Sequence, residues 1–340
     1  MRFVFIFFLC CSLLHAENRN NQDRVKILVA GDVMFDWGLN KSRKNFGEFA
    51  PIKELIPLME EVDFRMVNLE TPICSSKNEM NENKSYVFRG EPKDLYLLKK
   101  LNIDLVFLGN NHAMDYGAKG LEETIENVEI NKLLYSGAGL NLSKSLEPIR
   151  FSIKDSDFKL VSVSSIGLPK QYATSNTPGV APYKLDSLVG IARKNKKDAL
   201  MLSVHWGIEY NLEPEGYQRQ QAKRLIQSGF KVIIGHHPHI PQGVEKYKNG
   251  IILYSLGNFI FGSMNQNLNH NMAAILHFEK NELVLCELVP IYGKFQKIGS
   301  HIFRPLTESE SEMFLYEILI LSEKLNTKVE IKNGRGYVYF

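Results

Sequence analysis

The sequence predicts an α/β fold from three observations. Short apolar runs of strand length recur along the chain, and helix-like stretches such as 118–134 and 218–227 lie between several of them. Strands that alternate with helices are typical of an α/β sheet. The runs lead into Asp, Glu, Asn or His, and such sheets bind ligands at the carboxyl ends of their strands. The six runs cover residues 25–30, 64–67, 105–108, 199–204, 232–235 and 251–255.

Residues 1–16 have the plan of a secretory signal peptide. A positive start is followed by apolar residues 3–14 and by Ala16, a small residue suited to cleavage, before a short polar lead at 17–24. An apolar stretch of this length is too short to span a bilayer as a permanent anchor. We therefore expect an exported protein, periplasmic or extracellular.

The first three runs lead into carboxylates, amides and a histidine. Asp32 follows the first run, and Asn68-Leu69-Glu70 follows the second. The third run ends at Gly109-Asn110-Asn111-His112, with Asp115 a few positions further on. The His112 imidazole is placed to protonate a leaving group, and Asp115 could orient that ring. A polar turn without function is the alternative for Asn111 and His112 taken alone.

Histidines follow the next two runs. His205 ends the fourth run, and the fifth stops at Gly235, where the backbone must turn sharply, before His236, His237 and His239. Neutral imidazoles bind metals. In an extended segment His237 and His239 would point to the same side. Three of the nine histidines lie within four positions, which favours a metal or acid–base site over unrelated surface histidines.

Together these positions offer oxygen and imidazole ligands but no thiolate. That mix suits one or two divalent ions, with Zn, Mn and Fe not distinguishable, and a carboxylate able to bridge two ions suggests a binuclear centre. Two ions a few Å apart activate water and stabilise an oxyanion, as in metal-dependent phosphoester hydrolysis. The predicted ligands are Asp32, Glu70, Asn111, His205, His237 and His239.

The end of the chain has structural signals. Thr307 and Glu310 have the spacing of a capping box that opens an amphipathic helix at 312–325, and residues 328–340 resemble a closing strand or hairpin. No Pro-rich or Gly-rich linker or repeat divides the chain. We therefore expect residues 25–305 and the segment 306–340 to form one domain.

Composition limits the kinds of partner and covalent cross-link that this protein can have. A formal net charge of +3 with no block of Lys or Arg argues against nucleic acid as a partner. Cleavage of the signal would leave Cys74 and Cys286, too few for a disulfide framework, and their pairing stays open. Cys10 and Cys11 raise a lipoprotein alternative, which the large residues before them disfavour.

Six motifs follow one another in the order of a known family. They are Gly31-Asp32-Val33-Met34, Asn68-Leu69-Glu70, the segment 109–117, the segment 205–210, Gly235-His236-His237-Pro238-His239 and the segment 254–259. The series resembles the capsule synthesis protein CapA family between about residues 26 and 261. Those proteins are associated with poly-gamma-glutamate capsule production, and their domain is similar to the calcineurin-like metallophosphoesterases. The resemblance implies a four-layer α/β/β/α sandwich with two mixed sheets.

The superfamily pattern supports the same ligand set and the acid His112, but it departs at Met34. That position usually holds a histidine, so one metal site would lose a ligand. A single metal held mainly by Asn111, His205 and His237 is one alternative. A site in which Asp36 or water fills the gap is another.

Three further residues are candidates for substrate binding. Glu209 and Tyr210 follow His205 and could meet substrate, although that turn could equally be packing. Arg89 could pair with an anionic substrate through its guanidinium, or it could pack on a neighbouring aromatic ring.

The resemblance implies a CapA-like protein of capsule, poly-gamma-glutamate or envelope polymer biosynthesis. We expect a metal-dependent hydrolase of a phosphoester or related anionic substrate. The alternative is a non-catalytic protein that binds an anionic polymer during capsule assembly. Membrane-bound capsule synthesis machinery is the partner that this role suggests.

Overall fold

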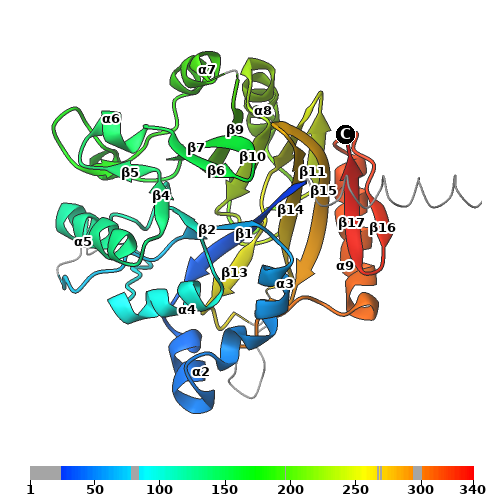
Figure 1. Ribbon diagram of the computed structural model, residues 1–340. Coiled ribbons are helices and arrows are strands. Elements are labelled where there is room, and N and C mark those ends of the chain that lie inside the picture. The colour runs from blue at the N-terminus through cyan, green and yellow to red at the C-terminus, as the bar shows by residue number, and fades with distance from the viewer. Residues whose placement is uncertain (1–23, 78–83, 196, 266–267, 269, 294–300) are drawn as a thin grey trace, which may run out of the picture.

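Two β-sheets pack face to face, and helices cover the outer face of each (Figure 1). The computed structural model describes residues 24–77, 84–195, 197–265, 268, 270–293 and 301–340. The predicted signal peptide and all but the last residue of the polar lead lie outside the described residues. The predicted four-layer α/β/β/α sandwich with two mixed sheets is confirmed.

The larger sheet has the strand order β16-β17-β15-β14-β1-β2-β3-β4, with β13 beside the end of β1. Strands β1 to β4 and β13 run parallel, whereas β14 to β17 are antiparallel to their neighbours. The strands are β1 Val25–Met34, β2 Phe64–Leu69, β3 Leu105–Phe107, β4 Leu134–Ser136, β13 Asn258–Phe261, β14 Asn271–Glu279, β15 Glu282–Ile291, β16 Glu330–Lys332 and β17 Arg335–Tyr339.

The smaller sheet has the order β11-β12-β10-β9-β7-β6. Its four inner strands are parallel, and the edge strands β6 and β11 are antiparallel to them. The strands are β6 Ile149–Ile153, β7 Ser156–Ser164, β9 Ala199–His205, β10 Val232–His236, β11 Val244–Tyr247 and β12 Gly250–Leu253. Two short strands, β5 Ala138–Gly139 and β8 Gly179–Val180, pair separately.

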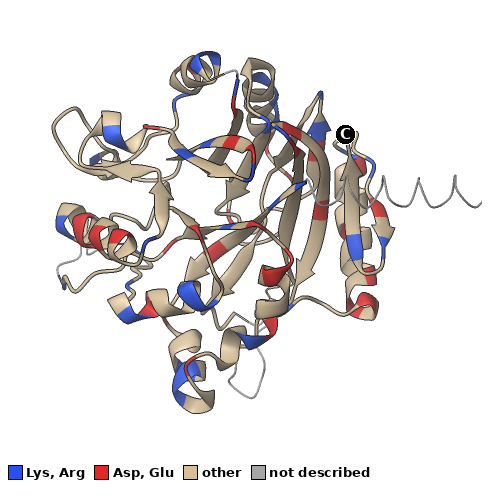
Figure 2. Cartoon of the chain, in the orientation of Figure 1, with Lys and Arg blue, Asp and Glu red and all other residues tan. Residues whose placement is uncertain are grey.

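Side-chain alternation along β1 explains why the sheets stack. Val25, Ile27 and Val29 point toward the smaller sheet and share a core with it, whereas Leu28 and Ala30 pack against the outer helices. A strand buried on both faces is apolar throughout, as the sequence is here. Figure 2 shows Lys, Arg, Asp and Glu mainly on the helices and the ends of the strands.

Helices complete the outer layers. Those that cover the larger sheet are α2 Gly38–Phe46, α3 Ile56–Glu60, α4 Leu95–Lys100 and α5 Gly117–Ile130, with the 3₁₀ helices Ala50–Leu55 and Pro92–Asp94. The smaller sheet is covered by α7 Leu185–Lys194 and α8 Gly216–Ser228. The helix α6 Leu142–Ser145 and the 3₁₀ helix Pro169–Gln171 lie in connections. Within the described part of the chain, none of the helices combines the length and apolarity that a bilayer crossing requires.

The C-terminal segment joins the larger sheet. Helix α9 Glu308–Glu323 begins with the capping box of Thr307 and Glu310, and its apolar side closes the core between the two sheets. The chain then ends in the hairpin β16–β17, whose second strand pairs with β15. The two described cysteines, Cys74 and Cys286, are buried and unbridged.

Strand β1 extends further than the apolar run that predicted it. It continues through Gly31 to Met34, so Asp32 is itself a strand residue that pairs with Asn68 and Asn258. A Cβ at Gly31 would lie 1.9 Å from the Gly257 carbonyl oxygen, so only glycine permits this close approach. The close packing brings the end of β1 to the edge where the candidate site lies.

Candidate metal centre

The carboxyl ends of β1 and β2 meet those of β9 and β10 at one edge of the sandwich. Asp32 Oδ1 lies 3.3 Å from His236 Nδ1, and Glu70 Oε1 lies 3.4 Å from His205 Nε2. Each of these pairs joins the larger sheet to the smaller one. The predicted convergence of strand ends is therefore present in the structure.

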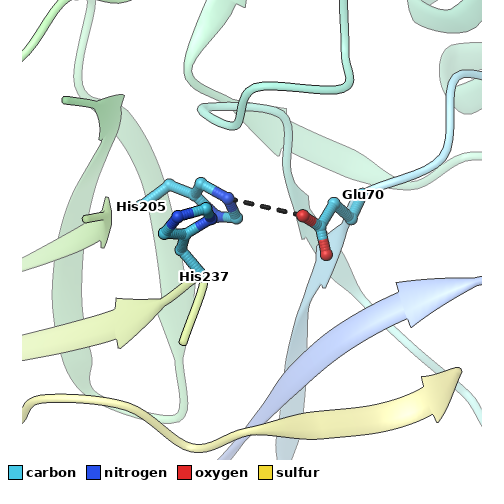
Figure 3. A group of neighbouring side chains, drawn as sticks. All are labelled: Glu70, His205 and His237. Carbon is cyan, nitrogen blue, oxygen red and sulfur yellow. Dashed lines mark ion pairs between the residues drawn. The ribbon is translucent and has the colours of Figure 1, made fainter. Parts of the chain in front are cut away.

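Two groups of potential metal ligands share Glu70. The first contains Glu70, His205 and His237, with both imidazoles facing the carboxylate in Figure 3. The second contains Asp32, Glu70 and His239. Within each group the ligand atoms all lie within 4.8 Å of one another. A carboxylate common to both groups has the position needed to bridge two ions.

Unpaired buried atoms support this assignment. Both oxygens of Glu70, Nε2 of His205, Nδ1 of His237 and Oδ1 of Asn111 are buried without a hydrogen-bond partner among the described residues. Burial raises the pKa of Glu70 well above its ordinary value, and the neighbouring Asp32 charge adds to the rise. Burying polar atoms without partners costs about 1–3 kcal/mol each, more for charged groups. A divalent cation would satisfy these oxygen and nitrogen donors, so the residues present fit the implied metal.

The turn after β10 aims the histidines. His237 and His239 have positive φ values, 97° and 58°, in a region that residues other than glycine rarely adopt. The segment is not extended here, because the backbone reverses at His237, so the same-side geometry of a strand does not apply to these two histidines. Strained backbone of this kind persists where the surrounding structure enforces it, often at functional sites. Both imidazoles still reach the shared Glu70.

Buried amides hold the ligands in place. Asn68 Nδ2 donates to Asp32 Oδ1 at 2.8 Å, and Asn110 Nδ2 donates to Asn68 Oδ1 at 3.1 Å. His239 Nδ1 lies 2.9 Å from Asn258 Oδ1. Hydrogen bonds of this kind fix the orientation of ligands around a metal. The sequence had drawn attention to the motifs that contain these amides but not to their positioning role.

The charges of the second group compensate one another. Burial would raise the pKa of Asp32, but His236 and His239 hold it well below its usual value. Burial opposes protonation of His239, yet Glu70 and Asp32 raise its pKa to about 10. His236, which is not among the predicted ligands, is thus a direct neighbour of Asp32. The pKa of His237 shifts in the opposite direction to that of His239, because burial and the charge of His239 lower it to about 4.

His112 and Asp115 form a hydrogen-bonded pair beside the cluster. His112 Nδ1 lies 2.8 Å from Asp115 Oδ2, and its Nε2 lies 3.9 Å from Glu70 Oε1. The Phe88 ring stacks on the imidazole with centroids 4.0 Å apart, and the Phe88 amide donates to Asp115. Burial lowers the pKa of His112 to about 4.

Lys84 is a contributor that the sequence did not reveal. Its Nζ lies 2.5 Å from Asp115 Oδ1 and donates to the Asn111 carbonyl oxygen at 2.9 Å. It comes from a polar stretch far from these residues in the sequence, so no local pattern could have indicated it. Lys84 links the backbone of the predicted ligand Asn111 to the carboxylate that orients His112.

The three residues predicted to contact substrate do not lie together in the structure. Glu209 and Tyr210 line a cavity of about 380 Å³ together with His112 and His239. Arg89 instead donates to the Ser76 carbonyl oxygen and lies over the Tyr116 ring, at 5.9 Å from its centroid. The structure therefore brings two of the three to the cluster.

Met34 and Asp36 serve packing and local structure. Met34 is buried in a small cluster with Phe88 and Phe261, and its sulfur accepts the Asp36 amide. The Asp36 carboxylate accepts from the Trp37 amide at 2.7 Å, at the start of α2. Neither side chain belongs to the two ligand groups.

The layered fold and the ligand-bearing strand ends define an α/β/β/α sandwich protein with a candidate metal centre at the edge where its two sheets meet. A family model described as "Bacterial capsule synthesis protein PGA_cap" matches residues 26–263. The chain belongs to this family.

Two relatives cover most of the chain. "PGA biosynthesis protein CapA" of Bacillus subtilis (strain 168) is 29% identical over 80% of this chain and 72% of its own length. "Capsule biosynthesis protein CapA" of Bacillus anthracis is 28% identical over 95% of this chain and 80% of its own.

One solved structure, of a hypothetical protein from Thermus thermophilus, aligns with a TM-score of 0.50 at 16% identity. The alignment covers 78% of this chain and 98% of that one. At this identity the likeness concerns the fold alone.

Proposed function

We propose that this protein is a metal-dependent hydrolase of a phosphoester or related anionic substrate in the biosynthesis of a capsule or envelope polymer such as poly-gamma-glutamate. The observation that carries the proposal is Glu70, a buried carboxylate that is shared by two ligand groups and accepts no hydrogen bond at either oxygen from the described residues. The family and the names of the two Bacillus relatives support the biosynthetic setting.

The metal would be held by Asp32, Glu70, His205, His237 and His239. Divalent ions bound there supply water activation and neutralise charge on phosphoryl oxygens. The unpaired Oδ1 of Asn111 is a further candidate donor.

His112 is the candidate general acid. Its Nε2 faces the ligand cluster, and in the imidazolium form this nitrogen can donate a proton to the leaving oxygen. Asp115 fixes the ring through Nδ1, and Phe88 fixes the plane of the ring by stacking. Lys84 holds the other oxygen of Asp115.

Two variants separate metal binding from chemistry. We expect the purified protein to bind about two equivalents of metal and to hydrolyse p-nitrophenyl phosphate esters. His112→Ala should lower turnover by about 100-fold or more while the metal content stays. His237→Ala should lose metal and turnover together. Metal analysis and steady-state kinetics of the same preparations make the comparison.

His277→Ala provides a matched control, because His277 is a buried histidine that pairs with Glu287 away from the cluster. It should keep both metal and turnover in the fraction that folds. Wild-type activity no higher than that of His237→Ala across several metals would exclude the hydrolase.

A non-catalytic role in polymer assembly is the second candidate. Met34 stands where the superfamily usually has a ligand, and the names of the relatives describe biosynthesis rather than hydrolysis. This candidate predicts that the protein binds an anionic polymer without turnover and that its deletion removes the surface polymer.

Both candidates place the protein outside the cytoplasm, beside membrane-bound synthesis machinery, as the plan of residues 1–16 suggests. Fractionation of cells, with N-terminal sequencing of the mature protein, tests cleavage after Ala16.

A further inference from the structure

The cavity beside His112 is walled by aromatic rings. Trp37, Tyr86, Phe88, Tyr210 and Phe261 all line it, and its volume is about 380 Å³. That size falls in the range of small-molecule sites. Tyr86 and Tyr210 are 57% and 53% exposed, so their rings are accessible at the rim of the cavity.

The rings form a continuous surface from the rim to the candidate catalytic groups. Trp37 packs edge-on against Tyr86 and Phe88, with centroids 5.7 and 5.2 Å apart. Phe88 stacks on His112. On the other side Phe261 lies 5.0 Å from the His239 ring. A ring that enters this cavity would therefore contact aromatic faces and the candidate acid together.

Two of these rings belong to residues with a strained backbone, which the surrounding structure must enforce. Trp37 and Tyr210 have φ values of 57° and 61°, in the left-handed region that bulky residues rarely adopt. The Tyr210 amide donates to the Pro238 carbonyl oxygen at 2.9 Å, which ties its loop to the histidine turn. The cavity wall is thus built into the metal-centre loops.

The charge of the cavity does not suit a polyanion. Among its described lining residues there is neither Lys nor Arg, and Glu209 contributes a carboxylate. The lysines lie elsewhere: Lys84 and Lys170 line a second cavity, of about 350 Å³, on the side of Asn111 and Asp115. An extended chain of carboxylates would meet Glu209 with no Lys or Arg beside it among the described lining residues.

We propose that the aromatic cavity is the leaving-group subsite and takes an uncharged ring with an apolar face. The inference rests on the proposed hydrolase, because His112, the candidate acid, lines this cavity and not the lysine cavity. The substrate is then an ester between an anionic group at the metal centre and a ring-bearing alcohol. Aromatic and sugar rings share the required stacking chemistry.

Binding of non-hydrolysable phosphonates tests the proposal without turnover. Phenylphosphonate and a hexose 1-phosphonate are compared with methylphosphonate by calorimetry on the Mn²⁺-loaded protein. We expect at least one ring compound to bind about tenfold more tightly than methylphosphonate. The better of the two rings identifies the class of leaving group. Tyr86→Ala and Tyr210→Ala should each reduce that preference by about fivefold.

Tyr316→Ala is the matched control, since Tyr316 is 60% exposed on α9, away from the cavity. It should leave the preference unchanged. The proposal is overturned if neither ring compound binds better than methylphosphonate, or if the two cavity variants keep the wild-type preference. It is also overturned if poly-gamma-glutamate displaces the ring compound.

Trp37 offers a second readout. The chain has two tryptophans, and Trp206 is fully buried elsewhere, so a ring bound in the cavity should quench the fluorescence of Trp37. Trp37→Phe should remove that response. Turnover is scored separately: ring-selective binding without hydrolysis of any ester contradicts the hydrolase and still supports the cavity as a ring-binding site.

Discussion

Glu70 shows how the surroundings of one residue define its chemistry. In the sequence it is one carboxylate after a short strand, whereas in the structure it is buried between imidazoles of the other sheet. No Lys or Arg pairs with its carboxylate among the described residues, and both oxygens lack hydrogen bonds. Burial therefore raises the pKa of this carboxyl group, and a bound divalent cation would stabilise its ionised form.

Asp115 provides the sharpest prediction at the residue scale. Asp115→Asn keeps the shape of the side chain but removes the charge that orients His112. We expect kcat to fall about 10- to 100-fold. The loss should be larger for phenyl phosphate than for p-nitrophenyl phosphate, because the poorer leaving group needs the proton more. Steady-state kinetics with both esters measure the ratio.

Asp186→Asn is the control for that variant, because Asp186 is an exposed carboxylate on α7. It should leave both rates unchanged. An equal loss on the two esters in Asp115→Asn would indicate a structural effect and contradict the role in orienting the acid.

At the scale of elements, the ends of strands position the candidate ligands, and the ends of helices fix the helices themselves. Strand β10 delivers His236 inside the sheet and then turns to present His237 and His239. Helix α9 is fixed at its start by Glu310, which accepts from Arg304 and from the Thr307 amide. The carboxyl end of β10 therefore builds the site, and the capped start of α9 stabilises the helix that covers the core.

The capping box of α9 predicts a pH dependence of stability. The hydrogen bonds from Arg304 and Thr307 lower the pKa of Glu310 from 4.5 to about 2. The stabilisation is therefore complete above the unfolded value and is lost as pH falls from about 4.5 toward about 2. Glu310→Gln should lower the free energy of unfolding by about 0.5–1 kcal/mol near neutral pH, since the pair is exposed.

Urea titrations near neutrality and near pH ~3 measure the difference between Glu310→Gln and the wild type, which should shrink in acid. Glu312→Gln, at an exposed position two residues beyond Glu310, should show little difference at either pH. A difference for Glu310→Gln that is constant with pH would contradict the assignment.

At the scale of the whole molecule, the candidate ligands join the two sheets. Asp32 lies in a strand of the larger sheet and Glu70 directly follows another, whereas His205 ends a strand of the smaller sheet and His237 follows the next. A ligand held by both sheets binds the folded state alone, so it stabilises the protein by mass action. Metal binding and the integrity of the sandwich are therefore coupled.

Metal should raise the melting temperature, with a stabilisation of about 2.7 kcal/mol at one hundred times its dissociation constant. Glu70→Gln should abolish this response. In chelator, however, the same variant should melt no lower than the wild type, because burial already disfavours the ionised carboxylate when no metal is bound. Thermal unfolding with and without metal gives both quantities.

Glu287→Gln is a matched buried variant, since Glu287 is paired with His277 and Arg335. It should melt lower in chelator and keep the response to metal. A Glu70→Gln protein that responds to metal as the wild type does would contradict the shared-ligand site.

Particular residues show how far the sequence could predict the site. The predicted strands and the polar residues after them are present, because burial of both faces of a parallel strand leaves a continuous apolar signal. The positive φ values at His237 and His239 were not predictable, because the course of a turn after a strand depends on what packs against it. Lys84 and the positioning roles of Asn68, Asn110 and Asn258 were not predictable, since their partners are distant in the sequence.

The sequence by itself determined the α/β class, the order of the family motifs and the residues able to bind a metal. Those features are local, because they depend on apolar periodicity and on the chemistry of single side chains. Only the tertiary structure decided that Glu70 is shared between two ligand groups, that Arg89 lies apart, and that aromatic rings wall the cavity at His112. These features depend on the stacking of two sheets, which brings together residues that no sequence spacing relates.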